Sequence, residues 1–238
     1  MITTCKPLGR KAYGSIGHLP SSRLGPGDHK VTDGQARICT EKARDSRDKI
    51  IVQEKLDGSC VAVALIDGIL LPLVRSGYPA VSSKYEQHHL FHDWVFANES
   101  SFRDCLKDGE RIVGEWLAQA HGTIYNLGYY SSRILPPFVA FDLMIGSVRM
   151  PFCDFKDRIG SRFYIPQVLG EGPMTIERMK LVLGEKGYHG AEAAEGAVWR
   201  VERDGKVDFL AKWVKPDKID GKYLPEVSKQ SAVWNWRP

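Results

Sequence analysis

Residues 50–74 read IIVQEKLDGSCVAVALIDGILLPLV and contain three apolar, β-branched runs separated by turn signals. The first run ends at Lys55, and the pair Asp57-Gly58 follows almost at once. The second and third runs are joined by Asp67-Gly68, a dipeptide that favours the tight turn of a β-hairpin. This stretch therefore predicts an antiparallel sheet with a lysine presented at the end of its first strand.

The rest of the chain mixes further strands with helices. Apolar, β-branched runs predict strands at 111–117, 138–144, 197–202 and 206–214. Asp204-Gly205 joins the last two of these as a second hairpin. Apolar residues at helical spacing predict helices at about 84–97, 154–163 and 175–186, the last of them capped by Thr175. The fold class is α+β with mostly antiparallel strands.

Composition narrows the class of protein. The chain has 238 residues, of which 43% are hydrophobic and 26% charged, as in ordinary globular proteins. Its formal charge of +4 tolerates an anionic partner without naming one. Five scattered cysteines form no CxxC pair and are typical of a reduced cytosolic protein. No apolar run is long enough for a membrane span or a signal peptide, so we expect a cytoplasmic protein.

The first 49 residues differ in character from those that follow. They are rich in Gly, Pro, Ser and charge, and they predict at most a short strand around Val31 or Ile38. We expect residues 1–49 to form a segment packed on the core, with a partly mobile arm as the alternative, and residues 50–238 to form the functional domain.

The stretch Glu54-Lys55-Leu56-Asp57-Gly58 carries the clearest chemical signal. A lysine that ends an apolar strand just before a turn presents its amine at the edge of a cleft. Such an amine becomes a nucleophile where its surroundings favour the neutral form. The simpler interpretation of this short pattern is a surface lysine before a turn.

An ordered series of further polar and aromatic residues follows at the ends of later strands: Arg75-Ser76-Gly77, Gly114-Glu115-Trp116, Phe141-Asp142, Glu195-Gly196-Ala197-Val198 and Lys212-Trp213-Val214-Lys215. Together with the lysine stretch, and in this order, they resemble motifs I, Ia, III, IIIa, IV and V of the covalent nucleotidyltransferases, the superfamily of DNA ligases, RNA ligases and mRNA capping enzymes. The resemblance covers roughly residues 50–216. It implies an ATP-grasp-like domain with antiparallel sheets and flanking helices.

The resemblance also implies a reaction. Lys55 would attack the α-phosphate of ATP, release pyrophosphate and keep AMP as a lysyl-AMP. The AMP would pass to a 5′-phosphate on nucleic acid, and a 3′-hydroxyl would then displace it and seal the strand. Such phosphoryl transfer depends mostly on positioning and charge neutralisation.

Roles for the remaining residues follow from the resemblance. Lys212 and Lys215 would neutralise charge on the α-phosphate. Arg75 suits a grip on the ribose or the 5′-phosphate. Phe141 would stack on adenine, although the alternation in its strand equally fits a core residue.

The acidic residues would hold the metal and the nucleotide. Glu195 is the leading ligand for Mg²⁺ or Mn²⁺, ahead of Glu192, and Glu115 would hold the ribose hydroxyls and help with the metal. Asp57 would orient the nucleophile or a metal-bound water. Glu54, next to the nucleophile, is taken as a nucleotide contact.

Two departures from the family pattern bear on the substrate. Position 60 is Cys60, where DNA ligases usually have an arginine, and this favours an RNA ligase. The last motif usually reads Lys-x-Lys, but Lys212 and Lys215 are three positions apart. Residues three apart on a regular strand point to opposite faces, so Lys212 is the surer phosphate contact.

Other notable residues have simpler interpretations. Trp116 and Trp199 are expected in the core. The histidines His88, His89 and His92 have metal-like spacing, but they fall in a predicted helix, and we interpret them as a solvated or partly packed helix face.

The length after the last motif favours a minimal enzyme. Only 23 residues follow Lys215, too few for the five-stranded OB-fold that usually closes over the nucleotide. The sequence thus predicts a monomeric, ATP-dependent RNA ligase that joins 3′-OH and 5′-phosphate RNA ends. The alternatives are a DNA ligase, a capping-type transferase, or a non-catalytic relative that binds RNA ends.

If no closing domain is present, other residues must hold the substrate. Trp234, Trp236 and Arg237 at the end of the chain are candidates, together with the basic residues of the first segment: Arg10, Lys11, Arg23, Arg37, Lys42, Arg44 and Arg47. Ordinary solubilising charge explains these basic residues equally well.

Overall fold

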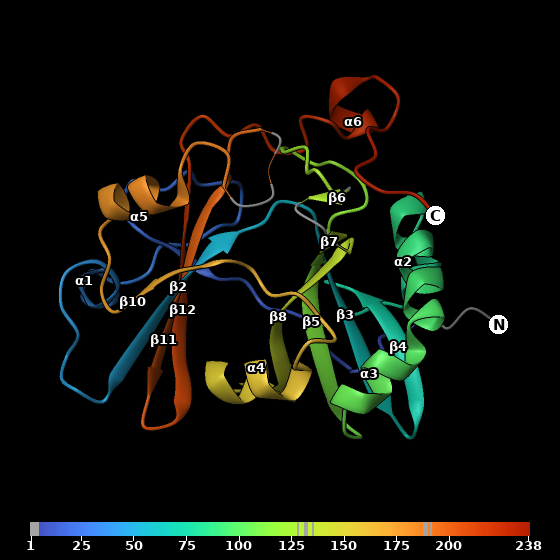
Figure 1. The fold of residues 1–238 in the computed structure, drawn as a ribbon, viewed down its shortest axis with the longest axis horizontal. Coiled ribbons are helices and arrows are strands. Elements are labelled where there is room, and N and C mark those ends of the chain that lie inside the picture. Colours follow the sequence, from blue (N-terminus) through green and yellow to red (C-terminus); the bar gives the residue numbers. More distant parts are fainter. Residues whose placement is uncertain (1–4, 128, 131–132, 135, 188–189, 191) are drawn as a thin grey trace.

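The computed structural model describes residues 5–127, 129–130, 133–134, 136–187, 190 and 192–238. Two five-stranded sheets lie side by side (Figure 1). The first sheet has the strand order β1 (Gly17–His18), β12 (Lys206–Val214), β11 (Gly196–Arg203), β2 (Asp48–Lys55) and β10 (Val168–Glu171). The second has the order β4 (Ile69–Val74), β3 (Ser59–Ile66), β5 (Glu110–Trp116), β8 (Phe138–Ile145) and β9 (Val148–Arg149). A separate short hairpin pairs β6 (Tyr129–Tyr130) with β7 (Arg133–Ile134).

The pairing is antiparallel except for the short β1, which pairs with β12 in parallel. This confirms the α+β class with antiparallel-rich sheets. The two predicted hairpins also form as expected. Asp67 and Gly68 have φ values of 50° and 74°, and Asp204 and Gly205 have values of 50° and 71°. Positive φ at both central residues is what a two-residue hairpin turn of matching twist requires.

The chain crosses from one sheet to the other at the Lys-x-Asp-Gly stretch. β2 ends at Lys55 in the first sheet, and β3 begins at Ser59 in the second. Gly58 allows this crossing, because a Cβ there would lie 2.5 Å from the backbone oxygen of Trp116. The lysine is therefore fixed at the junction of the two sheets.

The helices of the described ranges are α1 (Asp33–Thr40), α2 (Glu86–Ala97), α3 (Glu99–Cys105), α4 (Phe152–Ile159), α5 (Ile176–Leu183) and α6 (Pro225–Ser228), with a 3₁₀ turn, η1, at Ala80–Ser82. In Figure 1, α1 and α5 lie on the outer side of the first sheet, α2 and α3 lie on the outer side of the second, α4 lies between the two sheets, and α6 stands apart from both. The three predicted helices are present with shorter bounds, and Thr175 does cap α5 by accepting a hydrogen bond from the backbone N–H of Arg178.

The expectation of a strand at Ile38 is wrong. Ile38 lies in α1, which begins with a capping box in which the Thr32 side chain accepts from the Gln35 backbone and the Gln35 side chain accepts from the Thr32 N–H. These two bonds satisfy N–H groups that a helix start leaves without partners. The strand in this part of the chain is β1, at Gly17–His18.

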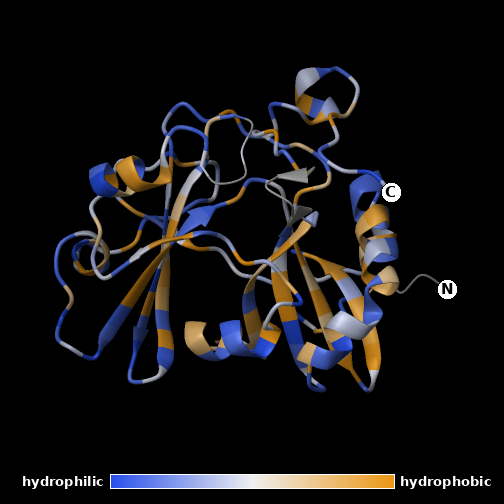
Figure 2. Cartoon of the chain, in the orientation of Figure 1, coloured by the Kyte–Doolittle hydropathy of each residue, from blue (hydrophilic) through white to orange (hydrophobic). Residues whose placement is uncertain are grey.

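Each sheet has its own hydrophobic core. Under the second sheet the core includes Trp116 and Phe138, and α2, α3 and α4 contribute apolar side chains to it. Under the first sheet Trp199 packs with apolar side chains from α1 and α5. Both tryptophans are fully buried, as predicted. Figure 2 shows the largely hydrophobic strands of the second sheet beside helices with mixed surfaces.

The ends of the described chain pack on these cores. Ala12 and Tyr13 are buried on the second sheet, while Leu19 is buried on the first. At the other end, the Trp236 ring lies 5.7 Å from that of Trp116, edge to face. No helix in the described ranges combines the length and the hydropathy of a membrane span.

Candidate active site

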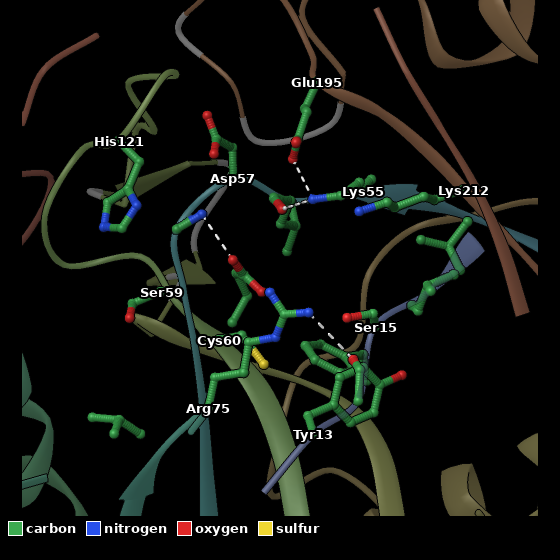
Figure 3. A pocket seen from close by; sticks show the side chains of 18 of the residues that line it. Tyr13, Ser15, Lys55, Asp57, Ser59, Cys60, Arg75, His121, Glu195 and Lys212 are labelled. Atoms are coloured by element: carbon green, nitrogen blue, oxygen red, sulfur yellow. Dashed lines mark hydrogen bonds and ion pairs between the residues drawn. The ribbon is translucent and has the colours of Figure 1, made fainter. Parts of the chain in front are cut away.

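A cavity of about 970 Å³ lies where the two sheets meet, and Figure 3 shows it from close by. Eight of the nine residues proposed from the sequence line it: Glu54, Lys55, Asp57, Arg75, Glu115, Phe141, Glu195 and Lys212. They come from both sheets and from the crossing between them. Lys215 does not line this cavity; it lines a smaller one of about 250 Å³.

Strand register brings Lys55 and Glu195 together. Gly196 at the start of β11 pairs with Lys55 at the end of β2, so the preceding Glu195 stands beside the lysine. The Lys55 Nζ lies 2.6 Å from the Glu195 Oε2 (Figure 3). Glu192, the competing acid, instead contacts Tyr223 and Lys222 away from this cavity.

Lys218 is a site residue that the sequence interpretation missed. Its Nζ lies 2.9 Å from the Asp57 Oδ1 and is also ion-paired with Glu195, and only 9% of the residue is exposed. It therefore joins two of the proposed site carboxylates. No local pattern in the sequence marks it, because only the folded chain brings it to these two carboxylates.

Asp57 is held on three sides. Its Oδ2 accepts a hydrogen bond of 2.8 Å from the backbone N–H of Gly122, and its own N–H donates to the Tyr125 hydroxyl at 2.8 Å. With Lys218 on its Oδ1, the carboxylate has a fixed orientation close to Lys55. This arrangement makes Asp57 an anchor of the crossing.

Glu115 projects from β5 into the cavity across from Lys55. Its Oε1 accepts a hydrogen bond of 2.9 Å from the backbone N–H of Gly58. Burial raises the pKa of Glu115 to about 7, although Lys55 and the Gly58 N–H oppose the shift. Near neutral pH this carboxyl group is thus divided between its charged and neutral forms.

The charges around Lys55 hold it as a cation. Burial favours the neutral amine, but the carboxylates of Glu195, Glu115 and Asp57 outweigh burial and raise the pKa of Lys55 above its ordinary value. Binding of a cation by these carboxylates would weaken that effect. The amine is therefore poised to lose its proton only when the carboxylates have another partner.

Lys212 enters the cavity from β12. Burial and the nearby Lys55 lower the pKa of Lys212, while Asp28, at 3.6 Å from its Nζ, opposes the shift. β12 ends at Val214. The backbone N–H of the following Lys215 donates a hydrogen bond of 3.0 Å to the backbone carbonyl oxygen of Glu195. The two lysines of the last motif thus serve different cavities.

An aromatic and basic wall completes the site. Phe141 is half-buried in β8, lines the cavity, and lies 5.2 Å from the Tyr13 ring in an edge-to-face contact. Arg75 is exposed, and its guanidinium donates to the Gly14 backbone oxygen at 3.4 Å (Figure 3). Cys60 also lines the cavity, and burial raises the pKa of its thiol.

Histidines in this region are packing groups. His88 lies between the Ser59 and Ser83 hydroxyls, at 2.8 and 2.6 Å, and burial lowers its pKa to about 4. His121, from the loop after β5, also has its pKa lowered to about 4 by burial and by Lys218. Within the described ranges no group of three His, Cys, Asp or Glu side chains is arranged to hold a metal ion.

The site nonetheless suits a hard divalent cation bound with few protein ligands. Glu115 and Glu195 offer carboxylate oxygens at one cavity. Mg²⁺ is usually held by one or two carboxylates together with waters and substrate phosphates, and it does not need a cage of protein groups. Burial is the main cause of the raised pKa of Glu115, because it makes the ionised carboxylate unfavourable, and an added cation beside the carboxylate would favour its ionised form.

Solved structures with a similar fold are RNA ligases. A Naegleria gruberi RNA ligase variant with ATP and Mn matches with a TM-score of 0.53 and 14% identity, over 90% of this chain and 62% of that one. A second variant, with AMP and Mn, matches with a TM-score of 0.51 and 14% identity over the same shares. An archaeal ATP-dependent RNA ligase gives 0.48 and 18%, over 71% of this chain and 43% of that one. The chain thus spans less than two thirds of each of these structures.

Comparison of the sequence with known proteins and with family models gives two results. No curated protein sequence matches the chain. The model of the RNA ligase family matches residues 48–214, from the start of β2 to the end of β12. This range includes both sheets apart from β1 and contains Lys55, Glu115, Glu195 and Lys212. Because the match covers more than half of the sequence, the chain belongs to the RNA ligase family.

Proposed function

We propose that this protein is an ATP-dependent RNA ligase that joins 3′-OH and 5′-phosphate ends through a lysyl-AMP. The observation that carries the proposal is the position of Lys55. It stands at the junction of the two sheets, 2.6 Å from Glu195, in a cavity that also receives Glu115 and Lys212. Family membership supports the same activity.

In the first step Lys55 Nζ forms a bond to the α-phosphorus of ATP, and the bond to the pyrophosphate oxygen breaks. The ammonium must first give up a proton. Glu195 Oε2 already accepts a hydrogen bond from Lys55, and a cation bound by the carboxylates would favour loss of this proton. Lys212 lies on the same cavity and faces the negative charge that develops on the phosphate.

Two transfers to RNA complete the reaction. An oxygen of the RNA 5′-phosphate attacks the phosphorus of the lysyl-AMP, which frees the Lys55 amine and leaves AMP on the RNA. The 3′-hydroxyl of the other end then attacks the 5′-phosphate, AMP leaves, and a phosphodiester remains. Arg75, which is exposed and lines the cavity, would bind the RNA phosphate.

We propose that the same site binds ATP and a divalent metal ion. The Naegleria gruberi structures are with ATP or AMP and Mn, which supports ATP and Mg²⁺ or Mn²⁺ here. Glu195 and Glu115 would hold the cation, which supplies positive charge to the phosphates. Glu115 would also hold the ribose hydroxyls, Phe141 would stack on adenine, and Glu54 would contact the nucleotide; all three line the cavity.

The finer architecture is part of the proposal. We infer an ATP-grasp-like nucleotidyltransferase domain over residues 50–238, with residues 5–49 packed on it. The nucleotide cavity between two sheets and the burial of Ala12, Tyr13 and Leu19 support this division. All strands of the described ranges belong to these sheets or to the β6–β7 hairpin, which supports the absence of an OB-fold from them. We further propose that the protein is a monomer in the cytoplasm. Its five cysteines are free, which fits a reducing compartment.

The test is covalent labelling followed by ligation. The protein is incubated with ATP or GTP labelled at the α-phosphate and Mg²⁺, then denatured. We expect label from ATP that survives denaturation, needs the divalent ion, and disappears in Lys55→Ala. Nicked RNA, nicked DNA and single-stranded RNA are then offered to the labelled protein. Joining of DNA in preference to RNA, or absence of label with either nucleotide, would overturn the proposal.

A further inference from the structure

Two exposed tyrosines stand at the mouth of the cavity and have no role in the reaction described above. Tyr78 is 40% exposed and Tyr85 is 39% exposed, and both line the cavity. They flank η1, between β4 and α2. Large aromatic side chains left open to solvent at the edge of a polar site are available to a ligand.

Each tyrosine has a lysine beside its ring. The Lys6 Nζ lies 5.0 Å from the centre of the Tyr78 ring, and the Lys84 Nζ lies 5.1 Å from the centre of the Tyr85 ring. Lys11 and Arg75 line the same cavity, and the Arg10 backbone packs on the loop before Tyr78. We call Tyr78, Tyr85 and these five cations, namely Lys6, Arg10, Lys11, Arg75 and Lys84, the tyrosine lip.

The cations of the tyrosine lip are not neutralised by the protein. Within the described ranges, none of the five has a carboxylate oxygen within 4.0 Å, whereas other basic residues of the first segment do. Arg44, for example, binds Asp48 and Asp208, and Arg47 binds Asp45. The five cations of the lip therefore lack carboxylate partners in the part of the chain that the structure describes, whereas Arg23, Arg37, Arg44 and Arg47 each have one.

Backbone contacts fix the N-terminal segment beside the lip. The Arg75 backbone oxygen accepts hydrogen bonds from the N–H groups of Ala12, at 3.0 Å, and Tyr13, at 3.3 Å. Gly77, with φ of +91°, lets the chain pass so closely that a Cβ there would lie 2.1 Å from the Arg10 oxygen. Figure 3 shows the segment at Tyr13 and Ser15 running beside Arg75. These contacts hold Arg10 and Lys11 next to Tyr78.

We propose that the tyrosine lip binds an unpaired RNA strand on its way into the cavity. The inference rests on the proposed function and adds the kind of RNA end that the site takes. A single strand offers bases that stack on aromatic rings and phosphates that bind lysine and arginine, and the lip provides both in alternation. A base within a duplex is already stacked and paired, so the rings give no advantage to a nick in which every base is paired.

The test measures binding of a fluorescent single-stranded RNA that lacks a 5′-phosphate, so that no ligation occurs. Loss of both rings in Tyr78→Ala/Tyr85→Ala is expected to weaken binding by about 5- to 150-fold for each stacked base. Tyr78→Phe/Tyr85→Phe keeps the rings and should bind like the wild type. Phe96→Ala, which removes a 43%-exposed ring of α2 that does not line the cavity, is the matched control and should have no effect.

Two further measurements test the role of charge in the tyrosine lip and its preference for unpaired RNA. Lys84→Gln should lower the slope of log affinity against log salt by about 0.7, the value for one phosphate contact to a single strand. A fully paired duplex of the same sequence should bind equally to the wild type and to the double alanine variant. Equal losses for single strand and duplex, or an alanine variant that binds single strands like the wild type, would overturn the proposal. Covalent labelling by ATP is scored separately, so failure of the lip is distinguishable from failure of the ligase activity.

Discussion

The carboxyl group of Glu115 gives a sharp prediction because burial in the cleft makes its charge unfavourable. Its pKa is raised from 4.5 to about 7 in the folded protein. The folded state therefore binds this proton more tightly than the unfolded state does. Ionised Glu115 destabilises the fold above about pH 7, and this cost disappears as the pH falls toward the value of the unfolded chain.

The size of the effect follows from that shift. Glu115→Gln removes the ionisation and keeps a side-chain oxygen for the Gly58 N–H. Between about pH 5 and about pH 8.5, the variant should gain about 2.5 kcal/mol of unfolding free energy relative to the wild type. Taking the difference between two pH values cancels any change in packing. The same substitution should abolish covalent labelling if the carboxylate binds the ribose or the metal.

The assay is urea unfolding of both proteins at the two pH values, without divalent ions. Glu177→Gln, an exposed glutamate in α5, is the matched control and should give the same difference from the wild type at both. A Glu115→Gln variant whose stability difference does not change with pH would refute the idea that burial in the cleft makes the Glu115 charge unfavourable.

Two further substitutions test the frame of the site. Lys218→Met leaves Asp57 and Glu195 with one cation fewer and should cost about 3–5 kcal/mol in urea unfolding; a cost below about 1 kcal/mol would contradict the buried ion pairs. Gly196→Ala places a Cβ 1.9 Å from the Trp213 oxygen, so β11 and β12 must shift. This should cost about 1–3 kcal/mol and reduce ATP labelling, and a variant as stable and as readily labelled as the wild type would contradict the strand register.

Patterns that act over neighbouring residues were readable from the sequence. The apolar, β-branched runs in 50–74, the two Asp-Gly turns and the helical spacing after Thr175 each predicted an element that the structure contains. The motif order also placed eight proposed residues on one cavity. These succeed because the strands carry their own turn signals and because most of the motifs lie at or near a strand end, although Phe141 lies in the middle of β8.

Features that depend on distant contacts were not readable. Ile38 looked like a strand residue, but the capping box at Thr32 and burial of one face of α1 make it helical. Lys218 has no local pattern, and only the folded chain brings it to Asp57 and Glu195. In the same way, the basic residues of the first segment looked alike, yet only some lie free of carboxylates at the cavity mouth.

The central claim is that Lys55 is the nucleophile. The most direct test is peptide mapping by mass spectrometry after the protein has been incubated with ATP and Mg²⁺ and denatured. We expect one added AMP, attached to the peptide that contains Lys55, and none on the peptides that contain Lys212 or Lys218. AMP on another lysine, or an unmodified protein under conditions in which RNA is joined, would contradict the claim.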